Sequence, residues 1–197
     1  VYEVRQIPEA KLSDYLAEKL KKGARVGYDP RLHTIGEVER LEESLKPKGI
    51  ELAALAENPV DLAWSDRPEA PLAPVHPHDI EHAGVAAADK IAGIQAELVK
   101  SGDAAVVLTQ GDAIAWTFNI RGGDLKHTPF TLAYAIVPAK GKPSLFIDRR
   151  KVSANVRGHI EAVAKLESPE KLPASLEALG KRKAKVRLDP AGTSAWF

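Results

Sequence analysis

The sequence predicts an α/β protein of two modules with mixed sheets flanked by helices, the first of them truncated. Apolar residues at helical spacing alternate with short β-branched and aromatic runs, the pattern of a sheet with crossover helices. Prolines at every third position interrupt this pattern once. The 197 residues, 44% of them hydrophobic and 28% charged, suffice for two small cores.

The first module is expected to cover residues 1–66. Two apolar stripes predict its helices, and glycine follows each of them, as it often follows a helix. The predicted order is strand, helix, strand, helix, strand over residues 2–7, 8–22, 24–28, 35–48 and 50–55.

A linker is expected over residues 67–79. Its prolines, at positions 68, 71, 74 and 77, favour an extended and semi-rigid chain. We therefore expect the boundary between the modules here.

The second module is expected to cover residues 80–197. Asp79 is expected to cap a long helix that reaches Ser101. A shorter helix should begin at Asp112 and end at Asn119 and the following glycines, with Trp116 and Ile120 in the core. The other elements are predicted as strands over 104–109, 134–137, 145–148 and 184–188 and helices over 152–165 and 172–179.

Composition excludes several classes of function. The net charge of +1 gives no long-range field to attract nucleic acid or an anionic membrane. The basic cluster Lys181-Arg-Lys183 is expected to be a solvated turn, with a nucleic-acid patch as the alternative. No apolar run approaches the roughly 20 residues of a membrane span. The chain contains no cysteine, and its lack of methionine fits either a fragment of a longer protein or a sequence from which modified methionines are left out.

One cluster has the composition of a metal site. His78 and His82 are four residues apart at the start of a predicted helix, close to His76 and Asp79. One helix face could present both imidazoles to zinc. The surrounding prolines and the lack of a third ligand favour a solvated linker, so no metal ligand and no cofactor is predicted for this chain.

No pattern here supplies a nucleophile, a base and an orienting group, so no catalytic residue is predicted. The candidate functional residues are Arg121, Asp124 and His127, in a loop that begins beside two glycines. Glycines allow close approach to another surface, and a guanidinium can bind a carboxylate through two hydrogen bonds. The alternative is a surface loop whose charges pair locally.

Several motifs resemble the middle domain of three-domain Xaa-Pro aminopeptidases, in the creatinase/prolidase superfamily. They read Asn119-Ile-Arg-Gly122, His127-Thr-Pro129, Tyr134-Ala-Ile136 and Leu145-Phe-Ile-Asp148. Two earlier segments are similar to the first domain and the joint of the same family, Gly23 to Thr34 and Glu57 to Pro68. The resemblance covers nearly the whole chain, in the family's order.

The resemblance implies a non-catalytic N-terminal portion of a cytoplasmic enzyme that removes the first residue of Xaa-Pro peptides. The parent would carry two divalent metals, typically manganese, on a C-terminal catalytic domain that is absent here. This portion would wall the cleft, limit peptide length and form a homodimer, with Arg121, Asp124 and His127 facing the catalytic domain, the substrate path or a neighbouring subunit. The alternatives are a stand-alone binding module and a relative such as creatinase, which acts on another C–N bond.

Overall fold

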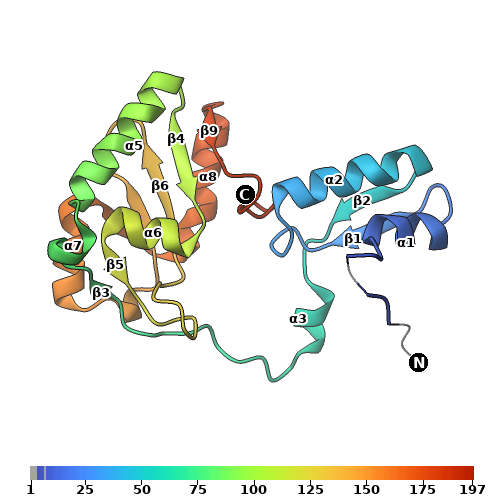
Figure 1. The fold of residues 1–197 in the computed structure, drawn as a ribbon, viewed down its shortest axis with the longest axis horizontal. Coiled ribbons are helices and arrows are strands. Elements are labelled where there is room, and N and C mark those ends of the chain that lie inside the picture. Colours follow the sequence, from blue (N-terminus) through green and yellow to red (C-terminus); the bar gives the residue numbers. More distant parts are fainter. Residues whose placement is uncertain (1–3, 7) are drawn as a thin grey trace. The chain divides into compact units, whose positions relative to one another are not determined.

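A computed structural model describes residues 4–6 and 8–197, which divide into two compact units (Figure 1). Of the described residues, unit 1 comprises 4–6, 8–68 and 190–197, and unit 2 comprises 69–189. The α/β class is confirmed in both units. The units differ from the expected division because residues 190–197, expected in the second module, belong to unit 1.

Unit 1 contains a parallel pair of strands, with Arg25 opposite Glu51. The strand expected over residues 2–7 includes Tyr2, Glu3 and Ile7, which lie outside the described residues. The elements of unit 1 are α1 (Leu12–Lys19), β1 (Arg25–Tyr28), α2 (Ile35–Leu45), η1 (Lys46–Lys48), β2 (Glu51–Ala54) and α3 (Pro59–Ala63).

Local residues determine where α2 begins and where the following η1 ends. Thr34 Oγ1 accepts a hydrogen bond from the Glu37 amide at 3.2 Å, and Glu37 Oε2 accepts one from the Thr34 amide at 2.8 Å. This reciprocal capping satisfies two amides that a helix start leaves unpaired. After η1 the chain reverses at Gly49, with φ of 67°, and places Leu45 and Ile50 in the interior.

The last residues of the chain complete unit 1. The amides of Ile35 and Gly36 donate to the carbonyls of Thr193 and Pro190, both at 2.9 Å. The Arg31 guanidinium lies 4.2 Å from the centre of the Trp196 ring. The start of α2 is therefore held by residues more than 150 positions away.

Unit 2 is built on a mixed sheet of five strands in the order β8-β7-β6-β4-β9. β4 is antiparallel to β6 and parallel to β9, while β7 is antiparallel to β6 and parallel to β8. Its elements are β3 (His76–Pro77), α4 (Ile80–Ala83), α5 (Ala87–Ser101), β4 (Ala105–Leu108), α6 (Gly111–Phe118), β5 (Ile120–Arg121), β6 (Tyr134–Pro138), β7 (Ser144–Phe146), η2 (Arg149–Lys151), α7 (Ala154–Val163), β8 (Lys165–Glu167), η3 (Pro169–Lys171), α8 (Leu172–Lys181) and β9 (Val186–Arg187).

Successive side chains along each strand point to opposite faces of the sheet. One face packs against α5, α6 and α7 in the main core, to which β6 and β7 contribute Ala135, Val137 and Leu145. Intervening residues such as Ile136 and Phe146 lie on the other face, near Leu179 of α8. The sheet thus has three helices on one side and one on the other.

Two expected features of unit 2 are wrong. The long helix from Asp79 to Ser101 is interrupted at Gly84, whose φ of 72° ends α4 before α5 begins, and the Asp79 side chain makes no capping bond. Trp116 is 52% exposed, whereas Ile120 is fully buried. Trp116 lies two residues from Ile114 and Phe118, which occupy the buried face of α6, and a helix turns residues two apart to different sides.

The proline-rich segment is not a free linker along its whole length. Val75 is buried and donates its amide to the Lys151 carbonyl at 2.9 Å. His76 and Pro77 then pair with Arg121 and Ile120. The end of the expected linker is therefore part of unit 2.

No helix in residues 4–6 and 8–197 is both long and apolar enough to cross a membrane.

Candidate functional site

The candidate loop follows the C-terminal end of α6. Asn119 has a left-handed backbone, with φ of 49°, and ends the helix. Residues Ile120 and Arg121 then form β5 against β3. Gly122 packs against Thr131, so closely that a β-carbon at this position would lie 2.8 Å from the Thr131 Cβ. This packing joins the start of the loop, at Gly122, to its end, at Thr131.

Arg121 is directed back at helix α6, which precedes it. Its Nη1 donates to the carbonyls of Ala115 at 3.1 Å and Ile120 at 2.8 Å. Two other side chains bind the same helix end, Lys90 at the Trp116 carbonyl (2.9 Å) and His159 at the Phe118 carbonyl (2.9 Å). The last carbonyls of a helix lack partners within it and carry partial negative charge, so side-chain donors stabilise them.

Lys90 is the most deeply buried of these donors, with 5% of its surface exposed. It also donates to Asn119 Oδ1 at 2.7 Å and lies 4.5 Å from the centre of the Trp116 ring. Burial lowers the pKa of Lys90, and the nearby charge of Arg121 lowers it further. Lys90 and Asn119 together fix the geometry from which the loop departs.

Asp124 lies inside unit 2, with a side chain that is 0% exposed. Its carboxylate bonds to Lys151 Nζ at 2.6 Å, to Thr131 Oγ1 at 2.8 Å and to the amides of Leu132 (2.7 Å) and Ala73 (3.2 Å). Burial acts to raise the pKa of Asp124, but the bonds from Lys151, Leu132 and Thr131 outweigh it and hold the pKa below its ordinary value. The carboxylate therefore joins four segments rather than facing outward.

His127 occupies the exposed part of the loop, with a positive φ of 63°. The structure thus gives the three predicted residues three different environments. Arg121 binds a helix end, Asp124 binds a buried lysine, and His127 meets solvent. They share a loop but do not converge on one point.

Three exposed leucines adjoin, along the chain, Asp124 or the amides that bind it. Leu132 is 46% exposed, Leu125 is 42% exposed and Leu72 is 37% exposed. Leu132 gives its own amide to Asp124, Leu125 follows Asp124 directly, and Leu72 precedes Ala73, whose amide also binds Asp124. We call these three residues the leucine surface. The order of residues does not reveal this surface, because nothing in the sequence indicates that the Ala73 amide binds Asp124.

The histidine cluster is incomplete as a metal site. The rings of His78 and His82 are 5.9 Å apart between their centres, and His82 lies 3.4 Å from a carboxylate oxygen of Glu81. Burial lowers the pKa of His78, with a smaller contribution from Arg121. Among the described residues, no group of three or more His, Asp or Glu side chains is arranged to hold a metal.

Comparison with known proteins supplies the family. The family model described as the creatinase/prolidase N-terminal domain matches residues 66–197. The chain is 34% identical over 182 residues to Aminopeptidase P2 of Arabidopsis thaliana, covering 91% of this chain and 26% of that protein. It is 38% identical over 168 residues to a probable Xaa-Pro aminopeptidase P of Paracoccidioides lutzii, covering 85% of this chain and 27% of that protein.

A solved structure extends the likeness to the fold of nearly the whole chain. An X-prolyl aminopeptidase from Caenorhabditis elegans, described as a cytosolic enzyme with a di-nuclear active site, matches with a TM-score of 0.85 and 27% identity. The match covers 97% of this chain and 32% of the nematode chain. The chain thus spans about a quarter to a third of the length of these relatives. The resemblance drawn from its motifs is confirmed, and the chain belongs to the creatinase/prolidase N-terminal domain family.

Proposed function

We propose that this chain is a non-catalytic portion of a cytoplasmic Xaa-Pro aminopeptidase, in which it walls the substrate cleft and supports a homodimer. The observation that carries the proposal is the match of 97% of the chain to one third of the nematode X-prolyl aminopeptidase. In this role, shape and burial limit which peptides enter, while the reaction takes place on residues outside this chain.

The described residues do not fit a di-metal centre. Two divalent ions such as manganese need several carboxylate or imidazole ligands, and no group of three is arranged for a metal in the described part of the chain. We assign the metals to a catalytic domain of the parent protein.

The leucine surface is the proposed contact with that catalytic domain. Covering apolar side chains with a partner lowers the free energy, because it removes apolar surface from water. The buried Asp124–Lys151 pair holds the backbone under Leu125 and Leu132 in one position, and a preformed surface loses less conformational entropy on binding. The contact proposed for the loop is thus apolar, with Arg121 and His127 near it and Asp124 beneath it.

Activity measurements test the assignment. The isolated chain and the protein from its complete reading frame are incubated with manganese and a Xaa-Pro peptide. We expect turnover from the complete protein and none from the chain. Turnover by the chain above a boiled control contradicts the non-catalytic role. A complete protein that is folded and metal-loaded yet leaves Xaa-Pro peptides intact contradicts the peptidase assignment.

A second measurement tests the contact surface. We expect Leu125→Ser with Leu132→Ser, in the complete protein, to raise KM or weaken the dimer because the apolar contact is lost. Leu32→Ser is the matched control, since Leu32 is 69% exposed in unit 1. Arg121 is unsuitable for this purpose because its guanidinium also holds α6. If the double variant keeps wild-type kcat/KM and dimer affinity, the leucine surface is solvated and the proposal fails.

A further inference from the structure

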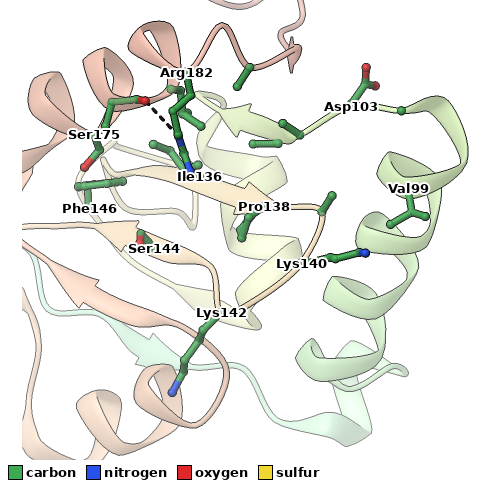
Figure 2. A pocket seen from close by; sticks show the side chains of 17 residues that line it. Val99, Asp103, Ile136, Pro138, Lys140, Lys142, Ser144, Phe146, Ser175 and Arg182 are labelled. Carbon is green, nitrogen blue, oxygen red and sulfur yellow. Dashed lines mark hydrogen bonds between the residues drawn. The ribbon is translucent and has the colours of Figure 1, made fainter.

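The face of the sheet that carries α8 has an open hollow beside that helix (Figure 2). Its volume is about 840 Å³. Ile136, Pro138 and Phe146 lie along its floor, and Val99 of α5 forms part of its wall. Val99 is 54% exposed, so its side chain is open to a partner. The hollow lies on the opposite side of the sheet from the main core.

Cationic side chains stand at its rim. Figure 2 shows the Arg182 side chain running from α8 toward Ile136, with Lys140 across the floor from it. The Arg182 Nε donates to the Ala178 carbonyl at 3.1 Å, which anchors the base of the guanidinium. Lys142 is also at the rim, although its ammonium binds the Glu161 carbonyl. Arg182 belongs to the basic cluster that the sequence analysis interpreted as a solvated turn.

The acidic residue that lines the hollow does not offset these charges. Asp103 bonds to Lys185 at 3.0 Å and to Arg187 at 2.7 Å. The hydroxyl of Ser101, followed by Lys185 and Arg187, lowers the pKa of Asp103 to about 2. Its negative charge is thus already paired with two cations, and the rim keeps an excess of positive charge in a protein whose net charge is only +1.

We propose that this hollow, bounded by Arg182, Lys140 and Val99, is a docking site for an acidic peptide segment that also carries apolar side chains. The acidic residues would pair with the rim, and the apolar ones would cover Val99 and the floor. A simple polyanion such as a nucleic acid would satisfy the rim and leave the apolar floor uncovered. The open form of the hollow suits a chain segment better than a small molecule, which is usually enclosed over most of its surface.

Fluorescence anisotropy of the chain tests the proposal with defined probes. The main probe is a labelled twelve-residue peptide in which glutamate alternates with leucine and phenylalanine. The comparison probes are polyglutamate of equal charge, the same peptide with glutamine for glutamate, and a single-stranded oligonucleotide. We expect saturable binding of the main probe, weakened by added salt, and much weaker binding of the other three.

Variants locate the site. We expect Arg182→Glu with Lys140→Glu to weaken binding about tenfold, since each rim charge contributes modestly. Val99→Gln should weaken it about threefold by removing apolar contact while leaving the exposed helix surface intact. Arg157→Glu is the control, an exposed charge reversal on α7 of the same unit.

Four results would overturn the proposal. The first is no saturable binding of the main probe, and the second is binding of that probe that survives the double reversal. The third is equal binding of polyglutamate or the oligonucleotide. The fourth is self-association of the chain that the double reversal abolishes. The last result would make a second copy the occupant. Circular dichroism of each variant confirms that its fold is retained. The proposal does not depend on the peptidase assignment, because every measurement uses the chain itself.

Discussion

At the scale of single residues, polar side chains in unit 2 mainly hold backbone segments together. Lys90, Arg121 and His159 bind carbonyls at one helix end, and Asp124 joins four segments through one carboxylate. The sequence predicted Arg121 and Asp124 to be interface or substrate-access residues, and that role stays a prediction. It could not show that the partners of Asp124 lie inside the unit, because Lys151 is 27 positions away and nothing local marks it as a neighbour.

We expect Asp124→Ala to reduce the free energy of unfolding by about 3–5 kcal/mol, because it leaves the Lys151 ammonium buried and unpaired. The Lys151 side chain is only 5% exposed. Urea unfolding at pH 7 measures the loss. Glu177→Ala is the control, since this glutamate is 68% exposed and should change stability by less than about 0.5 kcal/mol.

The same pair gives a pH dependence of known sign. The pKa of Asp124 is lower in the folded protein than its ordinary value, which is about 3.9 in an unfolded chain. Its contribution is therefore complete above about pH 4 and is lost as pH falls through the folded pKa. The difference in stability between wild type and Asp124→Ala should shrink as pH falls below about 4. A difference that stays constant down to the acid transition would show that the carboxylate is not stabilised in its charged form.

At the scale of elements, hydrophobic periodicity predicted most of the structure. The helices around α2, α7 and α8 and the strands β4, β6 and β7 lie where apolar spacing placed them. The predictions failed at two residues. Gly84 ends α4 and so interrupts the expected long helix, and Trp116 lies on the exposed face of α6 instead of the buried one. Periodicity averages over several residues, so it does not resolve a single left-handed residue or a tryptophan that covers a lysine from outside.

Two glycines provide a matched test of the packing between elements. We expect Gly122→Ala to destabilise unit 2 by about 1–3 kcal/mol, because the added carbon would lie 2.8 Å from the Thr131 Cβ. Gly93→Ala should instead stabilise it by about 0.5–1 kcal/mol, since Gly93 lies within α5 and open space surrounds the new carbon. Thermal or urea unfolding of both variants measures these changes in stability. Equal effects of the two substitutions would mean that the loop shifts freely away from Thr131.

At the scale of the whole molecule, the chain crosses from unit 1 to unit 2 and returns. Residues 190–197 follow β9 in sequence but belong to unit 1. Sequence reasoning placed them in the second module because chain order is the only guide to neighbours when periodicity is absent. Their polar and aromatic composition gave no signal of the strand-like bridge between Thr34 and Ser194.

This return path predicts that removal of residues 190–197 weakens unit 1 selectively. The carbonyls of Thr193 and Pro190 accept hydrogen bonds from Ile35 and Gly36, and the amides of Ala195 and Trp196 donate to the carbonyls of His33 and Pro30. Loss of these four bonds should cost roughly 2–6 kcal/mol, since each contributes about 0.5–1.5 kcal/mol. Amide hydrogen exchange measures each unit separately. We expect faster exchange in β1, β2 and α2 and unchanged exchange in β4, β6 and α7.

A single substitution separates the backbone contacts from the aromatic one. Trp196→Ala removes the contact with Arg31 but keeps the four backbone bonds, so it should cost only about 0.5–1 kcal/mol beyond the lost apolar burial. If the truncated chain protects the amides of α2 as well as the complete chain does, the terminal segment adds nothing to unit 1. If Trp196→Ala alone accelerates exchange as much as truncation, the aromatic contact rather than the backbone bonds holds the start of α2.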